Sequence, residues 1–279
     1  MSDVPLGAGL SSSAALEVAT AMFLGQIYPF EMGRLELALA CQAAENDFVG
    51  VNCGLLDQFS SIMGEDGQLI FMDFREPEKS RCIPLGNDVE LVLANTNAAH
   101  DLAEGTYNRL REDCFAAAKF FADKCSHSVT HLRDVSVDTF EEHAQDMSPE
   151  NMKRAKHIVT ENARVLRAVD ALGRGETRVM GECMLQSHAS SRDDFGNSCA
   201  ELDAMVECAK SLEGCYGARL SGEGFGGCTI NLVAADKAQD FARELTGRYQ
   251  ERTGIEPEMH ICQAVGGAVG GQLKANGKN

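Results

Sequence analysis

Residues 5–17 read Pro-Leu-Gly-Ala-Gly-Leu-Ser-Ser-Ser-Ala-Ala-Leu-Glu, and the rest of the chain is best understood from this stretch. Its glycines leave no side chain between the backbone amides and a ligand. Three hydroxyls follow and then helix-forming residues, so the stretch predicts a loop that runs into a helix. The first amides of a helix lack intrahelical acceptors, and the helix dipole favours negative charge there. We therefore expect a phosphate-binding loop.

This loop differs from the two commonest phosphate-binding loops. A P-loop has a Lys directly before its Ser or Thr, and a dinucleotide-binding loop has a third Gly where Ser12 stands. Taken alone, the stretch is therefore more typical of a glycine turn with a serine N-cap than of a nucleotide site. Two later motifs change that balance.

Composition limits the classes of protein to which the chain can belong. With 279 residues, we expect two domains. The net charge of −17 argues against nucleic acid and anionic membranes as partners, and it requires local amides and a metal ion to hold an anion such as ATP. The 11 cysteines form no Cys-x-x-Cys pair, and no signal peptide or membrane-spanning run is seen. We expect reduced thiols and a cytoplasmic protein.

The first part of the chain is mainly helical by pattern. Residues 12–27 are apolar on nearly all sides, which predicts a helix buried in a core. A second helix is expected over about 31–46. Residues 50–61 then form a glycine-bounded turn that leads into a short helix with Asp57 at its start.

Two acidic residues in this part suit phosphoryl transfer. That reaction needs a cation on the phosphates, oxygen ligands for the cation, and a carboxylate that takes the proton of the attacking hydroxyl. Ser12, Glu45 and Asp57 would together meet these needs. By spacing alone, Glu45 is better interpreted as a solvated acid at a helix end, and Asp57 as an N-cap.

The remainder of the chain alternates between strand and helix patterns. Strands are expected over 68–74 and 89–95, and long helices over about 107–125, 149–172 and 176–191, with a domain boundary near 95–102. A third motif, Ser-Gly-Glu-Gly-Phe-Gly-Gly-Cys at 221–228, joins a strand to a second strand over 228–234. This motif is either a flexible hairpin loop or a second glycine-rich loop that lies beside bound phosphates. A helix over 237–252 and a strand over 258–263 complete an antiparallel sheet with helices on one face.

Three motifs in this order resemble the galactokinases, which belong to the GHMP kinase superfamily. They are Pro-Leu-Gly-Ala-Gly-Leu-Ser-Ser-Ser-Ala at 5–14, Ala-Glu-Asn-Asp-Phe-Val-Gly at 44–50 leading to Cys-Gly-Leu-Leu-Asp-Gln at 53–58, and the glycine motif at 221–228. The likeness continues through Tyr107 and through residues 192–195 and 198–203. It covers nearly the whole chain.

The resemblance implies an α+β fold with two domains: an incomplete N-terminal ATP-binding domain over 1–95 and a C-terminal domain over 96–279 with an antiparallel sheet and helices. It implies transfer of phosphate from ATP, with Mg²⁺, to the anomeric hydroxyl of galactose. Asp57 would be the catalytic base, Ser12 and Glu45 would ligate the metal, and Gly54 and Tyr107 would lie beside the sugar. The ATP phosphates would be held by Gly7, Ala8, Gly9, Leu10, Ser11, Ser12 and Ser13. The loop that packs against this phosphate loop would contain Gly222, Gly224, Gly226 and Gly227.

The chain departs from the family at its beginning. Galactokinases carry a segment before the phosphate loop with a Gly-Glu-His-x-Asp sugar motif, a catalytic arginine and part of the adenine pocket. We expect an N-terminally truncated galactokinase that exposes apolar surface and needs a missing segment or a partner chain. The alternatives are an N-acetylgalactosamine kinase, a non-catalytic sugar- or ATP-sensing regulator, and an inactive remnant.

Overall fold

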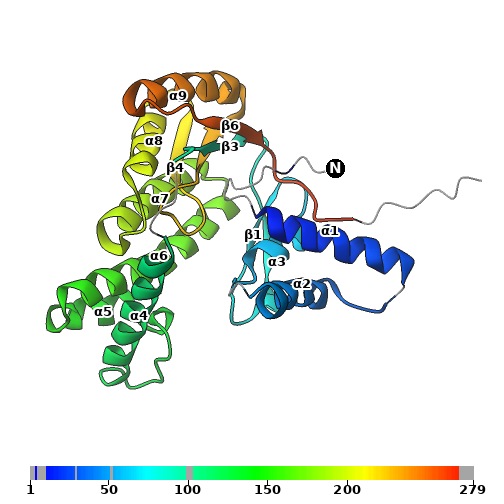
Figure 1. Cartoon of the computed structure of the whole chain (residues 1–279). Helices are drawn as coiled ribbons and strands as arrows, with labels where there is room; N and C mark the ends of the chain where they lie inside the picture. The colour runs from blue at the N-terminus through cyan, green and yellow to red at the C-terminus, as the bar shows by residue number, and fades with distance from the viewer. Residues whose placement is uncertain (1–3, 5–10, 29, 51–52, 99–102, 270–279) are drawn as a thin grey trace, which may run out of the picture. The chain divides into compact units, whose positions relative to one another are not determined.

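The computed structural model describes residue 4 and residues 11–28, 30–50, 53–98 and 103–269, except the side chains of 103, 104 and 107. The chain divides into two compact units (Figure 1). Unit 1 comprises residues 1–86 together with 263–279, and unit 2 comprises residues 87–262. The predicted strand at 89–95 belongs to unit 2. The extents of the two family domains stay a prediction.

Unit 1 is built on three helices, α1 (Ser12–Ile27), α2 (Arg34–Ala43) and α3 (Leu56–Met63). The first of them has the predicted bounds. Apolar side chains on one face of each helix meet in a small core that includes Val18, Ala38, Phe59 and Ile62. This core fixes α3 against α1 and α2, and it thereby positions the residues at the start of α3.

The second helix of unit 1 ends differently from the prediction. After α2 the backbone widens into a π-helical turn, η1 (Ala44–Val49), which ends at Gly50 in the left-handed conformation with φ 86°. A hairpin follows, in which β1 (Gln68–Phe71) pairs antiparallel with β2 (Arg81–Pro84). The second strand lies between the two segments, 68–74 and 89–95, for which the sequence predicts strands.

The burial predicted for the first helix is wrong for most of its apolar side chains. Only Ala14 and Val18 of α1 are buried, whereas Leu16 keeps 70% of its side-chain surface exposed and Phe23 keeps 55%. Burial on all sides would need packing partners around the whole helix, and α2 and α3 supply them on one side only. The expectation that apolar surface is exposed agrees with these values.

The glycine-rich segment after the last strand returns to unit 1. Backbone bonds join Gly67 N–H to Ala264 O at 2.9 Å and Ala268 N–H to Ser61 O at 2.7 Å. A side chain at Gly267 is excluded because its Cβ would lie 2.2 Å from the Ile62 carbonyl oxygen. The glycine here permits a close approach of two backbones.

Unit 2 contains a four-stranded antiparallel sheet in the order β4-β5-β3-β6. Its strands are β3 (Val89–Asn95), β4 (Cys215–Leu220), β5 (Cys228–Ala234) and β6 (Glu258–Cys262). The strand β3 pairs with β5 on one side and β6 on the other, with Val92 opposite Asn231 and Ile261. A strand from before the long helices therefore occupies the centre of the sheet.

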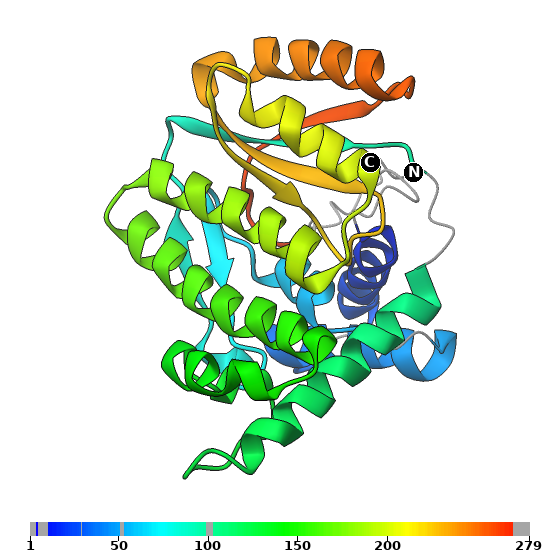
Figure 2. The same ribbon diagram turned by 90° about the vertical axis from the view of Figure 1, so that its left-hand side faces the viewer.

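Two helices cover one face of this sheet. These are α8 (Ala200–Lys210) and α9 (Ala238–Thr253), and their apolar side chains join Val92, Ala94 and Val233 in the main core. Figure 2 shows the orange α9 lying across the strands. We expected helices on one face of the sheet only. The helix α7 (Thr177–Ser190) was not part of that prediction, and it packs along the edge strand β4. There Gly181 and Gly217 approach so closely that a Cβ on either would meet backbone atoms at 2.1–2.2 Å.

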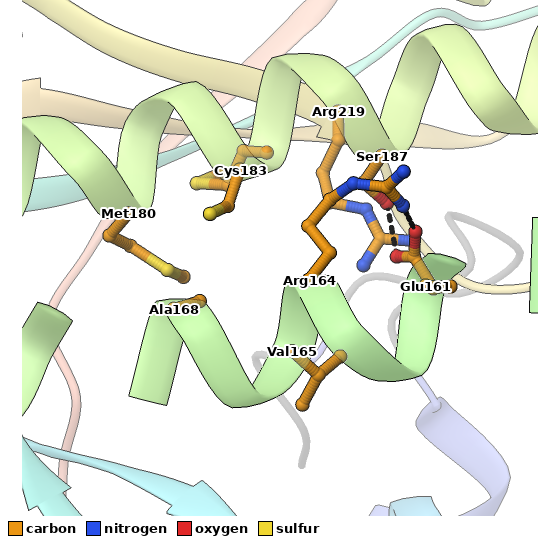
Figure 3. A pocket seen from close by; sticks show the side chains of 9 residues that line it. Glu161, Arg164, Val165, Ala168, Met180, Cys183, Ser187 and Arg219 are labelled. Atoms are coloured by element: carbon orange, nitrogen blue, oxygen red, sulfur yellow. Dashed lines mark hydrogen bonds and ion pairs between the residues drawn. The ribbon is translucent and has the colours of Figure 1, made fainter. Parts of the chain in front are cut away.

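A helical subdomain completes unit 2. It consists of α4 (Ala103–Ala122), α5 (Val137–His143) and α6 (Pro149–Gly173), whose second core includes Phe121, Leu132 and Val159. The helix α7 ends in a π-helical turn, η5 (Ser191–Phe195). A cavity lies between α6 and α7 beside β4 (Figure 3). Short 3-10 helices are η2 (Pro77–Lys79), η3 (Leu132–Asp134), η4 (Ala144–Asp146) and η6 (Ala235–Lys237).

Two further expectations can be compared with the structure. All 11 cysteines are free thiols in the structure, and each is buried or partly buried. Across the residues that the structure describes, none of the helices is both long enough and apolar enough to cross a membrane.

Candidate active site

Glu45 is a buried carboxylate at the start of the π-helical turn η1. Only 9% of its surface is exposed, although an ionised carboxylate is costly to remove from water. Its Oε2 accepts hydrogen bonds from Gln58 Nε2 at 2.8 Å and from the Cys53 thiol at 3.2 Å. Burial is the main reason that the pKa of Cys53 is raised, so the thiol keeps the hydrogen that it donates. Oε1 takes part in neither contact.

Gln58 links three segments of unit 1. It lies on α3, is fully buried, and its Nε2 also donates to Glu17 Oε2 on α1 at 3.0 Å. One amide group therefore holds two carboxylates from different segments. Burial raises the pKa of Glu17, the hydrogen bond from Gln58 opposes that shift, and the charge of Glu45 adds to it. The two carboxylates thus form an acidic pair with Gln58 between them.

Asp57 directly precedes Gln58 in the first turn of α3. Successive residues of an α-helix point about 100° apart, so the Asp57 side chain lies on a different side of α3 from that of Gln58. It is partly exposed. Gly54, just before the helix, is exposed and has open space where a side chain would stand. Gly54 and Asp57, at the start of α3, are therefore open to solvent.

The hydroxyl-rich start of α1 lies on the same helix as Glu17. Ser11 adopts a left-handed backbone with φ 55° and its carbonyl accepts the Ala15 N–H at 3.1 Å, which opens the helix. Ser13 stands four residues before Glu17, on the face of α1 that carries Glu17 to Gln58. The predicted phosphate-binding residues Gly7, Ala8, Gly9 and Leu10 lie outside the described residues.

The oxygen groups of unit 1 suit a magnesium ion that is shared with a nucleotide. Mg²⁺ is usually held by one or two protein oxygens together with substrate phosphates and water. Within the described part of the chain, no cluster of three or more His, Cys, Asp or Glu side chains could hold a metal on its own. Glu45 offers one hard oxygen of the expected kind, because its Oε1 is not used by Gln58 or Cys53.

The third glycine motif is the turn between β4 and β5 in unit 2, as the sequence predicts. All four of its glycines have positive φ angles, 70° at Gly222, 87° at Gly224, 143° at Gly226 and 74° at Gly227. Phe225 shares this feature with φ 60°, which is uncommon for a residue with a side chain. Such a backbone is held in place by its surroundings.

Asn197 and Thr96 hold this glycine turn from two sides. Asn197 Nδ2 donates to Glu223 O at 2.9 Å, while Asn197 O accepts the Phe225 N–H at 2.7 Å. The Thr96 hydroxyl donates to Gly227 O at 2.8 Å. A Cβ at Gly224 would lie 1.9 Å from Asn197 O, so glycine is required there. Hydrogen bonds and the close approach to Asn197 therefore define the path of this loop.

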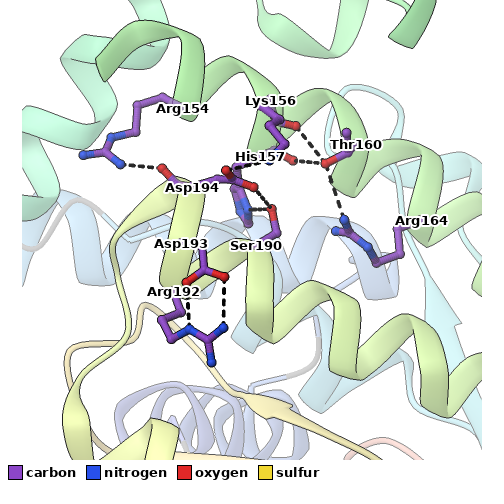
Figure 4. A network of polar contacts seen from close by, with 9 residues as sticks. All are labelled: Arg154, Lys156, His157, Thr160, Arg164, Ser190, Arg192, Asp193 and Asp194. Atoms are coloured by element: carbon purple, nitrogen blue, oxygen red, sulfur yellow. Dashed lines mark hydrogen bonds and ion pairs between the residues drawn. The ribbon is translucent and has the colours of Figure 1, made fainter. Parts of the chain in front are cut away.

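A network of polar side chains joins α6 to the end of α7 and to η5 (Figure 4). His157 Nδ1 lies 3.0 Å from Ser190 Oγ, and the Ser190 hydroxyl donates to Asp194 Oδ2 at 3.2 Å. The Asp194 carboxylate is paired with Lys156 at 2.9 Å. Burial, reinforced by Arg164, lowers the pKa of His157 to about 4, so its ring is neutral at pH 7.

Comparison with known proteins identifies the family. The model of the GHMP kinases N terminal domain matches residues 1–65, and that of the GHMP kinases C terminal matches residues 168–251. The galactokinase of Mannheimia succiniciproducens is 42% identical over 269 residues, which cover 95% of this chain and 68% of that protein. That of Haemophilus influenzae is 41% identical with the same coverage. The chain belongs to the galactokinase family.

A solved galactokinase supports the same assignment. The crystal structure of Lactococcus lactis galactokinase complexed with galactose superimposes with a TM-score of 0.87 at 34% identity. The match covers 95% of this chain and 68% of that one. The mixed helical and antiparallel fold expected from the sequence is therefore confirmed for this galactokinase-family chain.

The structure brings together only part of the predicted site of this galactokinase-family chain. Glu45 and the start of α3 with Asp57 are joined through Gln58, and α1 joins them through Glu17. The glycine motif lies in unit 2, and the side chain of Tyr107 is outside the described residues. The roles assigned to all these residues stay predictions.

Sequence reasoning missed the residues that hold the site together. Gln58 and Cys53 stand within the motif that suggested Asp57, and Glu17 ends the opening stretch, but nothing in their spacing predicts a shared hydrogen bond. Asn197 and Thr96 were missed as well. A signal for Asn197 exists in retrospect, because glycine-rich loops with positive φ angles need external hydrogen-bond partners.

Proposed function

We propose that this chain catalyses ATP-dependent phosphorylation of galactose at its anomeric hydroxyl, which gives galactose 1-phosphate and ADP. The observation that carries this proposal is the similarity to galactokinases over 95% of the chain, at 41–42% identity. The buried carboxylate Glu45, joined through Gln58 to the helix that carries Asp57 in its first turn, adds chemical support. A non-catalytic regulator and an N-acetylgalactosamine kinase are not favoured, because the relatives named above are galactokinases.

Asp57 is proposed as the catalytic base. Its carboxylate would accept the proton of the sugar hydroxyl as the new O–P bond forms, while the bond between the γ-phosphorus and the ADP oxygen breaks. No phosphoenzyme is needed, because the hydroxyl attacks in line. A positioned base contributes about 10² to 10⁴ in rate, and most of the remaining catalysis comes from positioning and from neutralisation of charge.

Ser12 and Glu45 are proposed as the protein ligands of the magnesium ion. When bound, Mg²⁺ supplies positive charge that offsets the charge on the transferring phosphate. Gln58 and Cys53 would hold Glu45 in place through its Oε2, so that Oε1 is free to face the cation. Backbone amides over residues 7–13 would bind the phosphate oxygens, and Gly54 and Tyr107 would lie beside the sugar.

Phosphorus NMR of the purified chain with magnesium-ATP and galactose tests the proposal. We expect a sugar 1-phosphate signal that needs both substrates and falls at least about a hundredfold in rate in Asp57→Asn. Glu65→Gln, which removes an exposed carboxylate shortly after the same helix, is the matched control and keeps its rate. Absence of product from the parent chain would overturn the proposal for this chain, and a near-normal rate in Asp57→Asn would overturn the assignment of the base.

Replacing the sugar in the same assay tests the acceptor. Galactose is expected to react at least about tenfold faster than N-acetylgalactosamine or glucose, because a pocket built around one sugar discriminates through unpaired polar groups. A faster reaction with N-acetylgalactosamine would favour the other sugar kinase.

A further inference from the structure

A cavity lies between α6 and α7 in unit 2, and none of the residues that line it is one to which we assign a catalytic or binding role. Its volume is about 90 Å³ (Figure 3). Val165 and Ala168 of α6 and Met180 of α7 form an apolar wall, while Arg164 and Arg219 lie at the polar end. The cavity therefore combines a hydrophobic surface with two guanidinium groups.

One of the two arginines has its charge satisfied inside the cavity. Glu161 pairs with Arg164 through Oε2, and its Oε1 accepts the hydroxyl hydrogen of Ser187. Both oxygens of the single carboxylate that lines the cavity are thus engaged. None of its hydrogen bonds reaches the second guanidinium.

Arg219 is the arginine left without a counter-charge. Its Nε is buried and has no partner among the described residues, and no ion pair of its side chain is found there. Burial lowers the pKa of the Arg219 guanidinium, and no nearby carboxylate offsets the shift. In a chain with net charge −17, an arginine with a buried and unpartnered Nε is unexpected. A buried charge without a partner is unfavourable.

We propose that this cavity binds a small organic carboxylate, with its head group on Arg219 and its short hydrocarbon tail on the apolar wall. The planar guanidinium offers two parallel N–H groups that match the two oxygens of a carboxylate. The wall of Val165, Ala168 and Met180 favours a ligand with carbon beyond the head group over a free phosphate ion.

The size of the cavity limits the length of the tail. An apolar cavity of roughly 150 Å³ accepts a molecule of six carbons such as benzene. The present cavity, at about 90 Å³, suits a carboxylate of two to four carbons, such as acetate or propionate. The inference rests on residues of unit 2 alone and holds whether or not the chain phosphorylates galactose.

Saturation-transfer NMR with sodium propionate and the full chain tests this site, with sodium phosphate at equal ionic strength as the competing anion. We expect propionate to bind, and its affinity to fall at least about tenfold in Arg219→Met, which corresponds to about 1.4 kcal/mol. Arg167→Met is the control variant. Arg167 is an exposed arginine on α6 that does not line the cavity, and it pairs with Glu182 at 3.4 Å. We expect Arg167→Met to bind propionate as tightly as the parent does.

The thermal midpoint of unfolding shows whether a variant has lost binding because it no longer folds. Without ligand, Arg219→Met is expected to unfold at or above the temperature of the parent, since an unpaired buried charge has been replaced by an apolar chain of similar length. Propionate at saturating concentration raises the midpoint of the parent and of Arg167→Met, but not that of Arg219→Met. The proposal is overturned if propionate does not bind the parent, if Arg219→Met binds it equally well, or if phosphate binds more tightly than propionate.

Discussion

The two π-helical turns of the molecule use the same backbone device for different purposes. Each ends a helix, each places an Asp-Phe pair shortly before a left-handed glycine, and in each the glycine N–H donates to the carbonyl five residues earlier, Gly50 to Glu45 at 3.0 Å and Gly196 to Ser191 at 2.7 Å. Each turn also buries one carboxylate, Glu45 in η1 and Asp194 in η5.

The two turns differ in what surrounds the buried carboxylate. Asp194 is paired with the Lys156 ammonium, and the neighbouring Phe195 stacks on His157 with ring centroids 4.6 Å apart. In the described contacts, the donors to Glu45 are an amide and a thiol, and the adjacent Phe48 is 93% exposed. The surroundings of the carboxylate, and not the helix type, therefore distinguish the two turns: Asp194 has a cationic partner, whereas the donors to Glu45 among the described residues are neutral.

The largest expected effect follows from removal of the charge at Glu45. Glu45→Gln keeps the shape of the side chain but lowers the rate of phosphoryl transfer at least about a hundredfold, since a metal ligand is worth several kcal/mol of charge stabilisation. Binding of Mn²⁺ in the presence of ATP, measured by electron paramagnetic resonance, weakens in parallel. Glu17→Gln is the matched control, with the same contact to Gln58, and loses less than about tenfold. Equal losses in the two variants would contradict the special role of Glu45.

A smaller loss is expected when the amide between the two acids is removed. Gln58→Met leaves Glu17 and Glu45 without their shared donor, so affinity for Mn²⁺ in the presence of ATP falls by about 10–100-fold. The free energy of unfolding in urea also falls, by about 1–3 kcal/mol, because a buried hydrogen-bond donor is lost. Gln42→Met provides the comparison, because Gln42 donates only to the Cys53 carbonyl at 3.1 Å. Unchanged Mn²⁺ affinity in Gln58→Met would show that Glu45 needs no such support.

The corresponding change in η5 is expected to affect stability and not the reaction. Asp194→Asn loses the pair with Lys156 and weakens the bond from Ser190, and it lowers the free energy of unfolding by about 1–2 kcal/mol while the rate stays within about threefold. Asp193→Asn, whose partner Arg192 is exposed, changes stability by less than about 1 kcal/mol. Urea unfolding and the NMR assay measure the two quantities. A large loss of rate in Asp194→Asn would erase the distinction between the two turns.

The pH dependence of stability tests the packing around η5. The pKa of His157 is about 4 in the folded state and close to 6.5 when unfolded. The unfolded chain therefore binds more protons between these values, and stability is lost as pH falls from 6.5 toward 4. The groups that shift this pKa besides burial are Arg164, Arg219, Asp194 and Arg154.

From pH 7 to pH 5.5, the parent is expected to lose roughly 1 kcal/mol of unfolding free energy more than His157→Gln. Urea unfolding at the two pH values gives the difference. If the parent and the variant lose the same amount, His157 is not held neutral in the folded state.

The smallest expected effects concern the two phenylalanines. Phe195→Ala loses the stacking on His157 and lowers the free energy of unfolding by about 1 kcal/mol. Phe48→Ala removes an exposed ring and changes the free energy of unfolding by less than about 0.5 kcal/mol. Thermal unfolding of the two variants side by side ranks them, and the reverse order would mean that Phe48 is packed in solution.

Much of the fold could be predicted because its elements are encoded locally. The bounds of α1, β3 and β5 agree with the apolar patterns, and those of α6 and α9 agree within one residue. The central place of β3 could not be predicted. Its contacts are long-range, as in the bond from Asn231 Nδ2 to Val92 O across 139 residues, and strand pairing over such distances leaves no local signal.

The candidate site also has a part that the sequence could predict and a part that it could not. Residue type and order suggested Glu45 and Asp57, because phosphoryl transfer needs carboxylates near a phosphate loop. The sequence pattern could not show that Glu45 is buried, since it stands in a π-helical turn that the α-helical period does not anticipate. The bridging place of Gln58 depends on the packing of α3 against α1, which is a tertiary property.

The return of the chain to unit 1 has a consequence for its synthesis on the ribosome. The Gly266 N–H bonds the side chain of Asp66 at 2.6 Å, and the two residues are 200 positions apart. At roughly 5–20 residues per second, the ribosome needs about 10–40 seconds to make the intervening chain. Unit 2 is continuous in sequence and can fold during that interval, whereas unit 1 must wait for its final segment. A nascent chain stalled before residue 263 would thus present the helices of unit 1 to chaperones without the backbone contacts that close them.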